Sequence, residues 1–123
     1  MRLGDFLEKD LIIADLKART KSQVLAELVE PLAGKVETLD PARAHKVLME
    51  REKLGSTGIG ENVAIPHGKM ASLDEIILVA GRAVEGIEFE ALDFKPCHIF
   101  FLVLAPEQVA GMHLRILAHI SRL

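Results

Sequence analysis

One histidine at the end of a glycine-rich stretch carries the most specific chemical signal in this 123-residue sequence. Residues 55–68 contain four glycines and one proline, which rule out a regular helix. Such a turn can present several backbone N–H groups to one anion, so the N–H of Gly68 is a candidate phosphate ligand. His67 lies between Pro66 and Gly68. Because imidazole is nucleophilic near neutral pH, the pattern indicates reversible phosphoryl transfer through an exposed His67 ring.

Several side chains near this stretch could hold a phosphoryl group. Phosphoryl transfer mainly requires positioning, together with positive or donor groups around the phosphoryl oxygens. Arg51, Ser56 and Thr57 are the candidates. A guanidinium can bind two phosphate oxygens at once, whereas Lys53 and Lys69 would act as point charges. The alternative is that these basic residues are solvated surface charges, and residue types alone leave the two interpretations level.

His113 is a second candidate, at the start of an expected C-terminal helix. Ile116, Leu117 and Ile120 follow it at helical spacing, so His113 shares their apolar face. A histidine in that position is more often a core residue than a ligand. A helix N-terminus also favours an anion, so His113 could instead help to hold phosphate.

The remaining histidines do not predict a metal site. His119 follows His113 by six residues, which rotates the two rings roughly 120° apart on a helix. His45 has no histidine at i+4, and His98 lies beside Cys97 in a strand whose neighbouring side chains point to opposite faces. We therefore expect neither a metal nor a cofactor, with His45, His98 and His119 structural or solvent-facing.

The elements that must position these residues alternate along the chain. Thr20 caps an amphipathic helix that ends near Gly34, and Asp40 caps a second that ends at Gly55. A third helix is expected over residues 111–123, without a C-terminal cap. Short apolar or alternating segments predict strands at residues 11–13, 63–65, 76–80, 87–89 and 99–104. This order indicates the α/β class, with a central mixed sheet flanked by helices in a layered sandwich.

Length and composition restrict the function classes. The chain has the size of one domain, residues 1–123. It contains neither an apolar run of about 20 residues nor a secretory signal, so we expect a cytoplasmic protein without membrane insertion. A net charge of -3 without a Lys/Arg cluster argues against nucleic-acid binding. The single cysteine, Cys97, excludes an internal disulfide and is expected to be buried.

Two segments resemble a known family. Residues 51–60 read Arg-Glu-Lys-Leu-Gly-Ser-Thr-Gly-Ile-Gly, and residues 63–69 read Val-Ala-Ile-Pro-His-Gly-Lys. This pattern resembles the fructose/mannitol-type IIA domain of the bacterial phosphoenolpyruvate-dependent phosphotransferase system, and the likeness spans nearly the whole chain. The resemblance implies that His67 is phosphorylated, that His113 is a second active-site histidine, and that Arg51 assists transfer.

The resemblance also implies partners. The donor would be an HPr-type histidine phosphocarrier or its nitrogen-type paralogue, and the acceptor a IIB domain or regulated target proteins. The opening residues 1–7 resemble the nitrogen-regulatory branch more than a sugar permease domain. Family members continue beyond the position of Leu123, so the chain is expected to be truncated. A non-catalytic binding domain that has lost the relay is the alternative, and the oligomeric state is left open.

Overall fold

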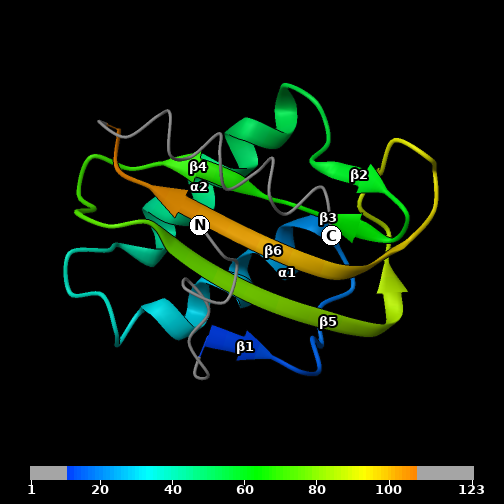
Figure 1. The fold of residues 1–123 in the computed structure, drawn as a ribbon, viewed down its shortest axis with the longest axis horizontal. Coiled ribbons are helices and arrows are strands. Elements are labelled where there is room, and N and C mark those ends of the chain that lie inside the picture. Colours follow the sequence, from blue (N-terminus) through cyan, green and yellow to red (C-terminus); the bar gives the residue numbers. More distant parts are fainter. Residues whose placement is uncertain (1–10, 108–123) are drawn as a thin grey trace.

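A computed structural model describes residues 11–107 of the chain. A six-stranded mixed sheet has the order β1-β5-β6-β3-β2, and β4 also pairs with β6. The two α-helices within residues 11–107 pack together on one face of this sheet (Figure 1). The strands are β1 (Ile12–Ile13), β2 (Gly58–Gly60), β3 (Val63–Ala64), β4 (His67–Lys69), β5 (Ile77–Ile87) and β6 (Cys97–Ala105). The expected α/β architecture with a central mixed sheet is confirmed.

Helix α1 (Lys21–Val29) begins where the sequence predicts. The Oγ1 of Thr20 accepts a hydrogen bond of 3.2 Å from the backbone N–H of Gln23, which satisfies a donor of the first turn. Its apolar residues recur on one face and are buried against the sheet and α2. A short 3₁₀ helix, η3 (Glu30–Leu32), then carries the chain towards Gly34.

Helix α2 (Pro41–Lys53) also has the predicted start. Oδ1 of Asp40 accepts from the N–H of Ala42 at 3.0 Å, and Pro41 occupies the first helical position, where its missing N–H costs nothing. The buried residues of α2 lie four apart: Ala44, Leu48 and Glu52. A carboxylate therefore continues the stripe that two apolar residues begin.

The central pair of strands differs in one respect from the prediction. Residues 76–80 and 87–89 were expected to be separate strands, but β5 runs continuously from Ile77 to Ile87 and pairs antiparallel with β6. Gly86 has a φ of +83°, a conformation open to glycine, and the register shifts between Arg82 and Ile87. Phe89 lies beyond the end of the strand, where its ring packs edge-on against Phe100.

Residues 63–69 run alongside β6 in two short strands. Val63 and Ala64 pair with the first half of β6, and His67, Gly68 and Lys69 pair with its second half. Pro66 interrupts the run because it has no N–H, although its carbonyl accepts from the N–H of Val103 at 2.9 Å. The glycine-rich segment thus becomes part of the sheet.

Apolar side chains gather on both faces of the sheet. The larger cluster lies between the sheet and the two helices, and includes Cys97, whose expected burial is confirmed. A smaller cluster contains Ile65, Leu78 and Val103. The helix expected over residues 111–123 lies outside the described residues. Within residues 11–107, no helix is long and apolar enough to cross a bilayer.

Candidate functional site

Strand β4 sets the direction of the His67 side chain. His67 pairs with Val103 of β6, which pairs in turn with Leu78 of β5. Residues in one cross-strand row point to the same face, so the His67 ring shares its face with the smaller apolar cluster. The neighbouring Gly68 faces α2 instead. His67 is half-buried, and less open than the sequence predicts.

Both nitrogens of the His67 ring make hydrogen bonds. The distance from Nδ1 to the carbonyl oxygen of Ile65 is 2.8 Å. Because a carbonyl can only accept, the proton sits on Nδ1. The Nε of Arg51 donates to Nε2 of His67 at 3.2 Å, so Nε2 carries the lone pair. The neutral ring therefore presents Nε2 as its nucleophilic atom.

Arg51 reaches the ring from the last turn of α2. Its Nε contacts His67, and its Nη1 donates to the carbonyl oxygen of Gly55 at 2.8 Å. Gly55 in turn donates its N–H to the carbonyl oxygen of Glu52 at 3.1 Å. The guanidinium fork thus spans the ring and the turn that follows α2, which a lysine could not do.

The environment of His67 favours the neutral ring. Burial has the largest effect and lowers the pKa of His67 below its ordinary value of 6.5. The hydrogen bond to the carbonyl of Ile65 acts in the opposite direction, the charge of Arg51 lowers the pKa, and the charge of Glu52 raises it. The net result is a ring that retains its nucleophilic lone pair at neutral pH.

Ser56 and Thr57 follow Gly55, whose carbonyl accepts from Arg51, but their hydroxyls already have acceptors. Ser56 Oγ donates to the carbonyl of Phe89 at 2.9 Å. Thr57 is buried, and its Oγ1 donates to Oε2 of Glu52 at 2.5 Å. The N–H of Thr57 donates to the other carboxylate oxygen at 3.1 Å. Either hydroxyl would have to change partner before it could bind a phosphoryl oxygen.

Glu52 is a residue that reasoning from the sequence missed. Its side chain is only 3% exposed, and Nζ of Lys21 lies 3.1 Å from Oε1. Lys21 also lies 3.5 Å from Oε1 of Glu90 and 4.7 Å from the centre of the Phe89 ring. The signal was available, because Glu52 continues the buried spacing of Ala44 and Leu48.

Gly68 has a packing role that its expected part in phosphate binding does not include. A Cβ at this position would lie 2.7 Å from Cγ1 of Val47 and 3.8 Å from side-chain atoms of Leu48 and Leu104. Glycine here lets α2 approach β4 closely. That approach brings Arg51 within reach of His67.

The structure describes two of the other four histidines, and both make their hydrogen bonds with residues outside this site. His113 and His119 lie outside the described residues. Nε2 of His45 lies 3.0 Å from the carbonyl oxygen of Ser22. Nδ1 of His98 lies 3.1 Å from the carbonyl oxygen of Ala83. In residues 11–107, no three His, Cys, Asp or Glu side chains are grouped closely enough to hold a metal ion.

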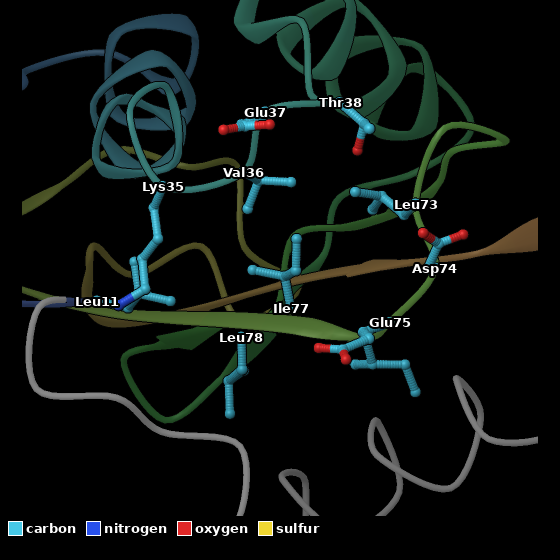
Figure 2. Close-up of a pocket in the computed structure, with 11 residues that line it drawn as sticks. Leu11, Lys35, Val36, Glu37, Thr38, Leu73, Asp74, Glu75, Ile77 and Leu78 are labelled. Atoms are coloured by element: carbon cyan, nitrogen blue, oxygen red, sulfur yellow. The ribbon is translucent and has the colours of Figure 1, made fainter.

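A pocket of about 410 Å³ lies away from His67 and Arg51. Figure 2 shows Ile77 of β5 pointing into this space, beside Val36 and Leu73, and Leu78 also lines it. Leu78 belongs to the face of the sheet that carries His67. Neither Arg51 nor His67 lines this pocket.

Comparisons with known proteins agree on one family. The family model described as "Phosphoenolpyruvate-dependent sugar phosphotransferase system, EIIA 2" matches residues 5–123. The chain is 39% identical to a nitrogen regulatory protein of Bradyrhizobium diazoefficiens, over 100% of this chain and 80% of that protein. It is 36% identical to the fructose-specific EIIABC component of Bacillus subtilis, over 100% of this chain but only 19% of that protein.

Solved structures give the same result. Nitrogen regulatory protein IIA-Ntr from Neisseria meningitidis superposes with a TM-score of 0.88 and 35% identity, covering 94% of this chain and 79% of that one. A complex of enzyme IIAMTL with phosphorylated enzyme IIBMTL from Escherichia coli matches with a TM-score of 0.75 and 23% identity, covering 94% and 79%. The second likeness is one of fold alone.

Proposed function

The chain belongs to the EIIA 2 family of the phosphoenolpyruvate-dependent sugar phosphotransferase system, and we propose that His67 is its phosphoryl-accepting residue. Family membership and the relatives support a phosphocarrier or regulatory role. One observation carries the assignment to His67. Its Nδ1–H is tied to a backbone carbonyl, while Nε2 faces a guanidinium that can bind phosphoryl oxygens.

The proposed step forms one bond and breaks one. Nε2 of His67 attacks the phosphorus of a donor phosphohistidine, and the donor's N–P bond breaks, with its electron pair returning to the donor imidazole. Arg51 must release Nε2 at this point, and its guanidinium then donates to the phosphoryl oxygens. The proton on Nδ1 stays hydrogen-bonded to Ile65 throughout, so the ring keeps its orientation.

The other candidate residues, Ser56, Thr57, Gly68 and His113, are proposed to bind the phosphoryl group or to complete the site. Ser56 and Thr57 bind the phosphoryl group only by exchanging their present acceptors for its oxygens, and Gly68 only through its backbone N–H. His113 is proposed as the second imidazole of the site. The phosphate adds a charge of roughly -2 at His67, which alters the surface that a partner meets.

We place the chain on the nitrogen-regulatory branch. The relative at 39% identity carries that name, and so does the solved structure that superposes with a TM-score of 0.88 at 35% identity. On this branch the donor is the nitrogen-type paralogue of HPr, and the output is phosphorylation-dependent binding to regulated proteins. On the sugar branch the donor is HPr and the acceptor a IIB cysteine.

The experiment uses the chain with labelled phosphoenolpyruvate, enzyme I and one of the two carriers. We expect acid-labile, base-stable label on the parent and none on His67→Ala, with faster labelling from the nitrogen-type carrier. His45→Ala is the matched control, because His45 contacts Ser22 away from the site. Equal labelling of parent and His67→Ala would overturn the site assignment. No label on the parent would favour a non-catalytic binding domain, and faster labelling from HPr would favour the sugar branch.

A further inference from the structure

A closed ring of hydrogen bonds links the two partners of the site. Arg51 donates to the His67 ring, and the ring donates to the carbonyl of Ile65. The N–H of Ile65 then donates to the carbonyl of Thr57 at 2.9 Å. The N–H and hydroxyl of Thr57 both donate to the carboxylate of Glu52. The backbone carbonyl of Glu52 then accepts from residue 55, whose own carbonyl accepts from Arg51.

We infer that Glu52 is a positioning residue, whose buried carboxylate holds the nucleophile and the guanidinium of the site in register. This inference rests on the proposed role of His67. Glu52 reaches the imidazole through Thr57 and Ile65, and it reaches Arg51 through the turn after α2. It touches neither reacting atom, so it acts through these neighbours.

The burial of Glu52 is the first reason for this assignment. Burying a carboxylate is costly unless the charge is paired and hydrogen-bonded. Three donors meet that need: the N–H of Thr57 at 3.1 Å, its hydroxyl at 2.5 Å and Nζ of Lys21 at 3.1 Å. An apolar residue would extend the stripe of Ala44 and Leu48 at less cost, so the carboxylate has a use besides packing.

The second reason is where the carboxylate and the two residues that donate to it lie in the chain. Lys21 is the first residue of α1, Glu52 lies in the last turn of α2, and Thr57 belongs to the glycine-rich segment. One carboxylate therefore fixes three separate parts of the chain at a single point. The segment between α2 and β2 contains Gly55 and Ser56, so its backbone has little rigidity of its own.

The test compares Glu52→Gln with Glu50→Gln, the same change at an exposed position on the same helix. The phosphoryl-transfer rate to His67 is measured with the carrier in excess. We expect Glu52→Gln to slow transfer roughly 10- to 100-fold, because a small misplacement of reacting groups has that effect. Glu50→Gln should transfer at the parent rate.

A second readout separates positioning from mere folding. In nitrogen-15 NMR of the folded protein, the parent should show the His67 proton on Nδ1. Glu52→Gln should move part of the population to the Nε2–H form, because Ile65 no longer holds the ring in place. A purely structural role would lower the unfolding midpoint and leave this proton where it is.

Thr57 supplies a pair of variants in case Glu52→Gln does not fold. Thr57→Ser keeps the hydroxyl that donates to Glu52, and Thr57→Val removes it with little change of shape. We expect parent-like transfer and tautomer for Thr57→Ser, with slower transfer and a shifted tautomer for Thr57→Val. The inference would be overturned if Thr57→Val and Glu52→Gln both kept the transfer rate and tautomer of the parent. If Glu52→Gln does not fold, the same result for Thr57→Val alone would overturn it. The proposed function would stand in that case, because it is tested separately by the labelling of the parent and of His67→Ala.

Discussion

Nε of Arg51 donates a 3.2 Å hydrogen bond to Nε2 of His67, the ring atom left without a proton by the carbonyl of Ile65. The cation and the nucleophile of the proposed reaction thus lie in contact before any phosphate arrives. A phosphoryl group that binds Nε2 must displace this hydrogen bond, and the displaced guanidinium is then adjacent to the incoming oxygens.

Replacing Arg51 with lysine should slow phosphoryl transfer, because an ammonium cannot contact His67 and Gly55 together. We expect a loss of roughly 10- to 100-fold for Arg51→Lys and a larger one for Arg51→Ala. Quenched-flow labelling of His67 measures the rate. Arg43→Lys, an exposed change on the same helix, is the control and should leave it unaltered. A parent rate in Arg51→Lys would mean that charge alone suffices.

The depressed pKa of His67 should appear as a dependence of stability on pH. Since the folded-state pKa lies below 6.5, an unfolded chain binds more protons than the native one between those two values. The contribution of His67 to stability is therefore complete above pH 6.5 and is lost as the pH falls towards the folded-state value. Denaturant unfolding of the parent and His67→Asn between about pH 5 and 8 isolates this contribution. If the stability of the parent relative to His67→Asn increased as the pH fell, the pKa of His67 could not be lowered in the folded protein.

Adding a methyl group at Gly68 should separate α2 from the sheet. The new Cβ would lie 2.7 Å from Cγ1 of Val47, so we expect Gly68→Ala to lower the free energy of unfolding by about 1–3 kcal/mol. Gly34→Ala is the control, because a Cβ there meets nothing within 4 Å. Adding Val47→Ala should restore part of the loss. Chemical denaturation of the parent, Gly34→Ala, Gly68→Ala, Val47→Ala and the double variant checks this, and additive effects at Gly68 and Val47 would refute the steric explanation.

The thiol of Cys97 should be inert in the folded protein. Burial, followed by the nearby charges of Asp93, Glu88 and Glu52, raises the pKa of Cys97 to about 11. At about pH 8 a disulfide reagent should react slowly with the native protein and quickly once guanidinium unfolds it. Cys97 is the single cysteine, so the released chromophore reports this residue alone. Equal rates in both states would exclude the buried thiol described here.

The helices of this fold could be predicted from the sequence because their signals are local. Thr20, Asp40 and Pro41 mark the starts of α1 and α2, and each acts through a backbone group two or three residues away. The pairing of Arg51 with the phosphate chemistry of His67 was a hypothesis from residue types. Their contact depends on the close approach of α2 to β4, which residue types do not specify.

The short strands β2 and β4 were not predictable in the same way. Each has three residues, and both contain glycine, so neither shows the alternation that marks a strand. Strand β4 exists because β6 supplies its hydrogen-bond partners from far along the chain. The role of Glu52 was missed for a different reason. A charged residue near a helix end is usually solvated, and this expectation outweighed its buried spacing from Leu48.

The pairing of β4 with β6 also has a consequence for the order of assembly on the ribosome. Residues 51–67 emerge early and carry both members of the reactive pair, but the strand that orients the imidazole begins only at Cys97. A nascent chain whose strand β6 has not yet left the ribosome holds the chemical groups without their alignment. The alignment of Arg51 with His67 therefore waits for the synthesis of β6.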